Sequence, residues 1–154
     1  MGSQTQQKIN EDLRSALKSG DQITLGVLRM VSSVFGNKSI EKRGRGLPKD
    51  LTEDEVLEIL NREAKKRREA ASLYKQGNRS DLAEKEEKEI VVIQKYLPAQ
   101  MSRKEVETFV TNTLPKLRSS QDLNFGSVMK EIMKELKDKA DAKIISEIIK
   151  EKLA

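Results

Sequence analysis

The sequence of 154 residues contains no cysteine, no histidine and no tryptophan. Without histidine and cysteine it lacks the commonest general base, the thiol nucleophile and the usual nitrogen and sulfur ligands of zinc. Gly44-Arg45-Gly46 is too short to replace a phosphate-cradling glycine-rich loop. A Ser–Lys nucleophile stays open as an alternative, but Ser32-Ser33 lacks the glycine-rich serine signature of amidases. We therefore predict no catalytic residue, no metal site and no cofactor.

Aromatic residues are also rare, at 3% of the chain, and there are only three prolines and eight glycines. The core must then consist of leucine, isoleucine, valine, methionine and alanine, which suits packed amphipathic helices better than a sheet. No apolar run approaches the roughly 18 residues that a membrane span needs. These features predict an all-α protein.

Charged residues are abundant, at 36%, and the net charge of +5 is spread over both halves. A nucleic-acid interaction must therefore depend on local patches of cations. The absence of cysteine fits a reducing compartment. Met1-Gly2-Ser3 resembles a scar left by recombinant expression, so the lack of a targeting segment carries no weight.

Helical periodicity and capping residues predict the order of the elements. Thr52 with Glu55 and Ser102 with Glu105 form two capping boxes, and Asp21 is a further N-cap. The second helix is expected to bury the stripe formed by Ile23, Val27, Met30, Val31 and Val34. We expect helices over residues 5–18, from 21 to a basic loop at 42–49, and over about 53–75, 80–96, 102–114, 125–137 and 141–152.

The third and fourth expected helices are the longest pair joined by a short turn, Gln76-Gly77-Asn78. At about 1.5 Å per residue they measure about 35 and 25 Å, and the turn makes them an antiparallel hairpin. Pro98 halts the fourth helix. The predicted organisation is therefore a four-helix N-terminal domain, residues 1–97, and a small three-helix C-terminal tail domain, residues 98–154.

The C-terminal part contains a recognisable motif. It consists of Gly126, Val128-Met129, Met133, the break at Ala140-Asp141 and the isoleucines 144, 145, 148 and 149. This pattern resembles the tail shared by the YqeY family and by one subunit of the tRNA-dependent Asp/Glu amidotransferases. Segments at 28–30, 51–68 and 96–100 also look like YqeY sequence. One departure is Asp138, where the family usually has glycine, a better residue for a left-handed helix end.

The resemblance implies a non-catalytic module that meets tRNA or a tRNA-handling complex, because the tail of that amidotransferase subunit contacts tRNA while the chemistry lies elsewhere. A protein–protein adaptor, with its partner held by the hairpin, is the first alternative. An amidotransferase-associated factor, with carbon–nitrogen ligase activity using glutamine as amido donor only by association, is the second. The resemblance also implies a mitochondrial or bacterial cytoplasmic location, without deciding between them.

The sixth expected helix separates its charges into two flanks. Lys130, Lys134 and Lys137 lie on one flank of the apolar stripe, and acidic residues lie on the other. Lys139 and Lys143 follow at the break and extend the basic flank. These five lysines are the candidate RNA-binding residues, through phosphate contacts. The alternative is that they simply solvate the helix.

Four charged residues interrupt the apolar stripes of the predicted hairpin: Glu63 and Arg67 on one helix, Glu86 and Glu89 on the other. A charge on an apolar stripe is tolerated only when it is paired. We therefore predict an ion pair between Arg67 and Glu86 or Glu89, with Glu63 as an intrahelical alternative. A functional polar groove is the other interpretation. The aromatic side chains all lie on apolar stripes, so recognition of RNA by base stacking is not expected.

Overall fold

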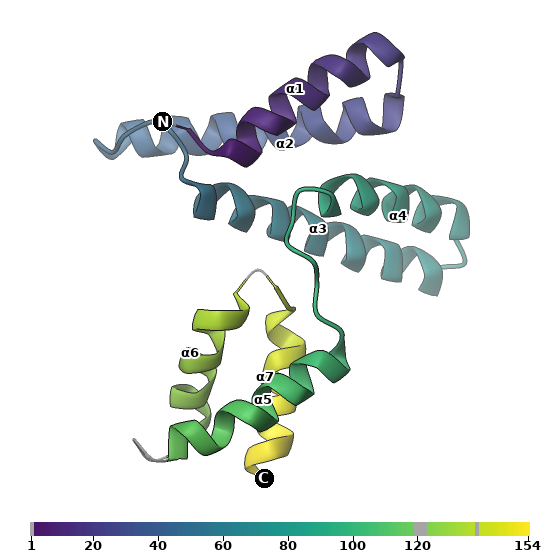
Figure 1. Cartoon of the computed structure of the whole chain (residues 1–154). Helices are drawn as coiled ribbons and strands as arrows, with labels where there is room; N and C mark the ends of the chain where they lie inside the picture. The colour runs from purple at the N-terminus through teal and green to yellow at the C-terminus, as the bar shows by residue number, and fades with distance from the viewer. Residues whose placement is uncertain (1, 119–122, 138) are drawn as a thin grey trace. The chain divides into compact units, whose positions relative to one another are not determined.

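The computed structural model describes residues 2–118, 123–137 and 139–154 (Figure 1). In these residues the chain forms seven α-helices and no β-strand, which confirms the prediction of an all-α protein. The helices are α1 (Gln4–Ser19), α2 (Gln22–Gly44), α3 (Glu53–Gln76), α4 (Ser80–Gln94), α5 (Arg103–Arg118), α6 (Phe125–Leu136) and α7 (Ala142–Leu153).

The helices belong to two compact units, Met1–Leu97 with α1 to α4 and Pro98–Ala154 with α5 to α7. Each unit has an aliphatic core of its own. The core of the first unit is centred on Ile9, Leu28, Val31, Phe35, Leu51, Val56, Leu60 and Ile93, and that of the second on Val106, Val110, Val128, Ile132, Ile145, Ile148 and Ile149.

The start of the first unit is fixed by hydrogen bonds as well as by apolar burial. The Ser3 hydroxyl caps α1 by accepting from the Gln6 amide, and it donates to the Glu53 carboxylate at 2.6 Å. Thr5 also donates to Glu53, so the first turn of α1 is tied to the first turn of α3. The chain leaves α1 at Gly20, whose φ of 77° is left-handed and suits glycine.

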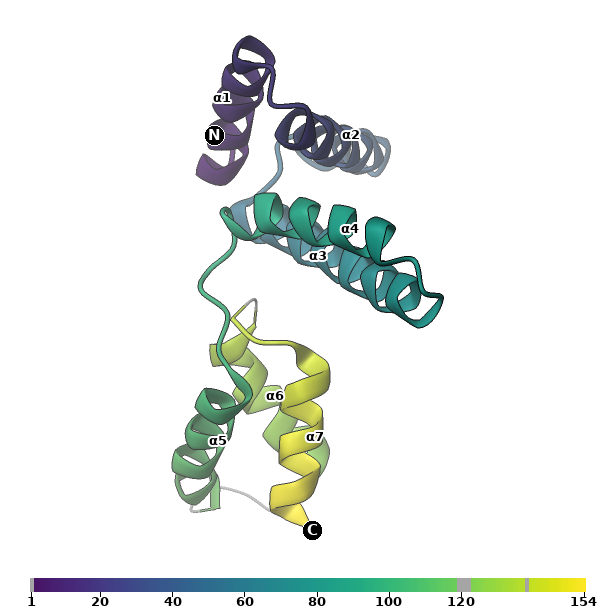
Figure 2. The ribbon, with the colours of Figure 1, turned by 90° about the vertical axis from the view of Figure 1, so that its right-hand side faces the viewer.

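The predicted hairpin is formed by α3 and α4, which run antiparallel and contact each other more extensively than any other pair (Figures 1 and 2). The capping box of Thr52 and Glu55 starts α3. Asn78, in a left-handed conformation with a φ of 58°, completes the turn after Gly77. The helix α4 ends at Gln94, well before Pro98.

The buried face of α2 matches the predicted stripe only in part. Val27 and Val31 are buried as predicted, but Ile23 is 44% exposed. Leu25, Leu28 and Phe35, which the predicted stripe did not include, are also buried. Apolar residues occur on more than one side of this helix, so periodicity alone could not choose the buried face. Contacts with α1, α3 and α4 make the choice.

The predicted start of the basic loop, at residue 42, is also wrong, because α2 continues to Gly44. Lys42 is 8% exposed, and its ammonium group donates to the Asp50 carbonyl at 2.7 Å and to Glu55 at 2.6 Å. Lys42 thus connects α2 to the start of α3 through these hydrogen bonds. It is not a cation available to RNA.

In the second unit α5 runs past the predicted end at Leu114 and includes Pro115. The reason is the apolar stripe of α5, which continues beyond the proline to Leu117, a residue packed against the core. The reciprocal hydrogen bonds of Ser102 and Glu105 start this helix, as predicted. Figure 2 shows α5, α6 and α7 as three short helices that pack together.

Candidate nucleic-acid interface

The helix α6 presents the predicted lysines because its opposite face is fixed in the core. Asn124 caps the helix and forms a capping box with Ser127, whose amide donates to the Asn124 side chain at 2.8 Å. Val128, Ile132 and Leu136 are 2% exposed or less. These contacts set the rotation of α6, so the side of the helix opposite this stripe faces solvent.

The break after α6 is held by backbone hydrogen bonds. The chain leaves the helix at Lys137, with φ of −53° and ψ of 132°. The Met101 amide then donates to the Lys139 carbonyl at 2.8 Å, which ties the break to the start of the tail. The departure from the family pattern at Asp138 lies outside the described residues.

All five candidate RNA-binding lysines are exposed, on α6, at the break or at the start of α7. Lys134 pairs with Glu131 at 2.9 Å, one turn away on the same helix, and their side chains are 60% and 33% exposed to water. Such surface pairs contribute about 0–1 kcal/mol, so Lys134 can exchange its carboxylate for a phosphate at little cost. The other four, Lys130, Lys137, Lys139 and Lys143, form no ion pair with any described residue.

The free amides at the start of α7 are also able to bind a phosphate, but Asp141 competes for them as the N-cap of the helix. Its carboxylate accepts a hydrogen bond from the Lys143 amide at 2.9 Å. The negative charge on this cap lies next to Lys139 and Lys143 in sequence and opposes an approaching anion. The lysine side chains, and not the helix terminus, are therefore the main feature of this surface.

Phe125 is a feature that the sequence placed wrongly. It lies on the apolar stripe of α6, yet it is 39% exposed, and the Lys150 ammonium group lies 5.5 Å from its ring centre. Phe125 is the first residue of the helix, so no preceding helical turn covers its ring. The position of Phe125 at the first residue of the predicted helix was the feature of the sequence that could have indicated its exposure.

Three of the four charged residues on the hairpin stripes come together in the first unit. Arg67 donates to Glu89 of α4 at 3.1 Å and to Glu63 of its own helix at 3.2 Å, and its side chain is only 11% exposed. Met30 of α2 lies 3.8 Å from the same guanidinium group. Glu86 forms no ion pair with a described residue. This cluster is closed by its own contacts, which favours a structural role over a polar binding groove.

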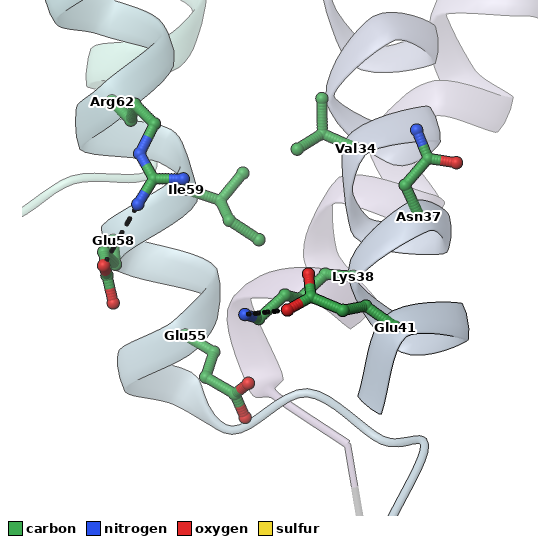
Figure 3. A pocket seen from close by; sticks show the side chains of 8 residues that line it. All are labelled: Val34, Asn37, Lys38, Glu41, Glu55, Glu58, Ile59 and Arg62. Atoms are coloured by element: carbon green, nitrogen blue, oxygen red, sulfur yellow. Dashed lines mark hydrogen bonds and ion pairs between the residues drawn. The ribbon is translucent and has the colours of Figure 1, made fainter. Parts of the chain in front are cut away.

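An open groove of about 430 Å³ lies between α2 and α3 (Figure 3). Val34 and Ile59 approach each other across it. Four of its charged side chains pair within their own helix, Lys38 with Glu41 at 3.7 Å and Arg62 with Glu58 at 3.2 Å. The fifth, Glu55, pairs with Lys42 at 2.6 Å. The charged groups that line the groove are therefore already engaged in ion pairs of the chain itself.

Metal binding and membrane crossing find no support in the part of the chain that the structure describes. Nowhere in it do three or more acidic side chains gather in a way that could hold a metal ion. None of its helices has the length and apolar character that crossing a membrane requires.

Comparison with known proteins agrees with the sequence motif. The family model described as Yqey-like protein matches residues 6–153, nearly the whole chain. The chain belongs to the YqeY family. This assignment rests on a match that includes both units, and not on the tail alone.

Several fungal relatives of this YqeY-family chain carry the name altered inheritance of mitochondria protein 41, mitochondrial. The one from Lachancea thermotolerans is 31% identical over 115 residues, 73% of this chain and 59% of the relative. The one from Kluyveromyces lactis is 29% identical over 116 residues, covering 73% and 60%. The one from Clavispora lusitaniae is 28% identical over 129 residues, covering 81% and 72%. The chain thus spans about three fifths of the length of the first two.

Proposed function

We propose that this YqeY-family chain is a non-catalytic helical module that binds tRNA, or a complex that handles tRNA, through the exposed lysines of α6 and the following break. The observation that carries the proposal is the set of five exposed lysines, four of them without an ion pair to a described residue. The resemblance of the surrounding motif to a tRNA-contacting tail supports RNA as the polyanion. Recognition would act on shape and phosphates, as on a folded RNA.

Contacts of this kind give weak, salt-sensitive binding. A few lysine–phosphate contacts alone give a dissociation constant of about 1 μM or weaker at physiological salt. The test is fluorescence anisotropy of labelled tRNA at two salt concentrations, with the natural chain and the triple variant Lys130→Glu, Lys134→Glu, Lys137→Glu. We expect the triple variant to lose binding while its melting temperature hardly changes, since lysine and glutamate have similar helix propensities.

A matched control changes three other exposed lysines, Lys8, Lys85 and Lys88, to glutamate. The net charge then changes by the same amount as in the α6 variant, and only the location differs. Loss of binding in both variants to the same degree would mean that only total charge matters. Equal binding by the natural chain and the α6 variant would overturn the proposal.

Two other roles stay as alternatives. A protein–protein adaptor predicts binding that resists salt, because apolar helix contacts depend little on ionic strength. An amidotransferase-associated role predicts co-purification with amidotransferase subunits. For location, the names of the fungal relatives describe those proteins as mitochondrial, and for this chain mitochondrion and bacterial cytoplasm both stay predictions.

A further inference from the structure

A second set of cations lies on one face of α3, in the other unit. Lys65, Arg68, Ser72 and Lys75 follow one another at spacings of three, four and three residues, which places them on one side of the helix. From Lys65 to Lys75 the face is about 15 Å long. In the sequence, Lys65 and Arg68 belong to a run of four cations, 65–68, whose members scatter around the helix. The common face becomes visible only when Lys75, outside this run, is included.

Arg68 is the unusual member of this face. It is partly buried, but among the described residues no carboxylate lies within ion-pair distance of its guanidinium group. Its neighbour Arg67 binds two carboxylates, and Lys66 pairs with Glu63. Because the Arg68 guanidinium group has no ion-pair partner in the described chain, it can bind an anion from outside without giving up an existing ion pair.

A groove of about 290 Å³ adjoins the Arg68 side chain, between α3 and α4. It is lined by Arg68, Ala71, Ser72 and Lys75 from α3 and by Glu87 and Ile90 from α4. The apolar members, Ala71 and Ile90, are already 5% and 7% exposed, so an apolar partner helix would gain little by covering them. A phosphate backbone needs cations and a hydroxyl group rather than apolar area, and arginine binds phosphate in a bidentate manner.

We propose that this α3 face, Lys65, Arg68, Ser72 and Lys75, is a second phosphate-binding surface for the RNA. The inference rests on the proposed function, because it gives the first unit a phosphate-binding surface of its own for the same class of ligand. Glu87 limits the surface in the free protein, since its carboxylate lies 2.5 Å from the Lys75 ammonium group.

The test is the salt dependence of tRNA binding by the full chain and the double variant Lys65→Gln, Arg68→Gln. Each phosphate contact contributes roughly 0.7–0.9 to the slope of log K against log salt, so we expect the slope to fall by about 1.5. The control is Arg62→Gln, Lys66→Gln on the same helix, whose cations are already paired with Glu58 and Glu63. The control should keep the slope of the natural chain.

A third variant, Glu87→Gln, should strengthen tRNA binding at low salt, because it frees Lys75. An unchanged slope in the Lys65, Arg68 variant, with the natural chain binding normally, would overturn this inference and leave the proposed function standing. Glu87→Gln binding no tighter than the natural chain would count against Lys75. A natural chain that binds no tRNA at low salt would overturn both this inference and the proposed function.

Discussion

Arg67 illustrates how single residues stabilise the hairpin. Its guanidinium group lies between Glu63 on α3 and Glu89 on α4 and is nearly removed from water. A charge on an apolar stripe predicted a partner across the hairpin, and the geometry gives that partner as Glu89. Periodicity could not decide whether Glu86 or Glu89 is the partner. The two residues lie one turn apart on α4, and the choice depends on how α4 packs against α3.

The change Arg67→Ala should destabilise the first unit strongly. It leaves Glu63, which is 5% exposed, without its main partner, and breaking a well-buried pair costs about 3–5 kcal/mol. The comparison is Arg62→Ala, which removes a surface pair with Glu58 and should cost about 1 kcal/mol or less. Urea unfolding measures both, and equal losses would contradict a structural role for the cluster.

The carboxyl group of Glu53, which accepts hydrogen bonds from Ser3 and Thr5, should make the stability of the first unit depend on pH. Burial raises the pKa of its carboxyl group, but hydrogen bonds from Ser3 and Thr5 outweigh burial, and the net pKa is lowered from the ordinary 4.5. A lowered folded-state pKa adds stability above the unfolded pKa, and that stability is lost as pH falls through the folded pKa. The natural chain should therefore lose more stability below about pH 4.5 than Glu53→Gln does.

Thermal melting of the two proteins at pH 7 and at pH 3 to 5 measures this difference. At pH 7 the natural chain should be the more stable, and the gap should close on acidification. A gap that is constant over this range would mean that the Glu53 hydrogen bonds do not depend on its charge.

Among the elements, the end of α6 and the start of α7 connect stability with the proposed binding. Asp141 caps α7, and its charge opposes a phosphate near Lys139 and Lys143. Asparagine caps a helix about as well as aspartate does. The change Asp141→Asn should therefore keep the melting temperature and strengthen tRNA binding by roughly threefold, the size of a terminal charge effect.

Anisotropy titrations and thermal melting test this prediction together. Asp141→Ala is the contrasting variant, since it removes the charge and also the cap, which costs about 1 kcal/mol. If Asp141→Asn binds tRNA less tightly than the natural chain, the phosphate does not approach the start of α7.

The sequence predicted the helix starts well and the buried faces less well. Thr52, Ser102, Asp21 and Asp141 each begin a helix as expected, because capping is a local interaction. The buried side of α2 and the exposure of Phe125 depend on neighbouring helices. The extension of α5 through Pro115 also needed tertiary information, because Leu117, beyond the proline, is partly buried against the core of the unit.

From the sequence, the candidate RNA-binding site could be predicted only as a set of exposed lysines. The separation of lysines and acids around α6 follows from helical spacing, since its apolar stripe is clear. The loss of Lys42 as a free cation could not be seen, because its partners, Glu55 and the Asp50 carbonyl, are set by the packing of α2 on α3. Arg68 was likewise hidden, since its lack of a partner is a property of the folded hairpin.

At the scale of the whole molecule, the chain consists of two units with separate cores. Both units are built from α-helices, and their cations are distributed over several surfaces. A function based on net charge alone would involve all of these surfaces equally. The proposed RNA binding instead uses particular faces, with the lysines of α6 as the principal one.

The most direct test of this claim is a salt series of tRNA binding with the natural chain and the Lys130, Lys134, Lys137 variant. For the natural chain log K should fall linearly with log salt, and the three lysines should account for roughly 2–3 of the slope. The triple variant should show no binding, or binding with a slope reduced by that amount. If the natural chain fails to bind tRNA at low salt, or if both proteins give the same slope, the lysine flank of α6 is not an RNA-binding surface.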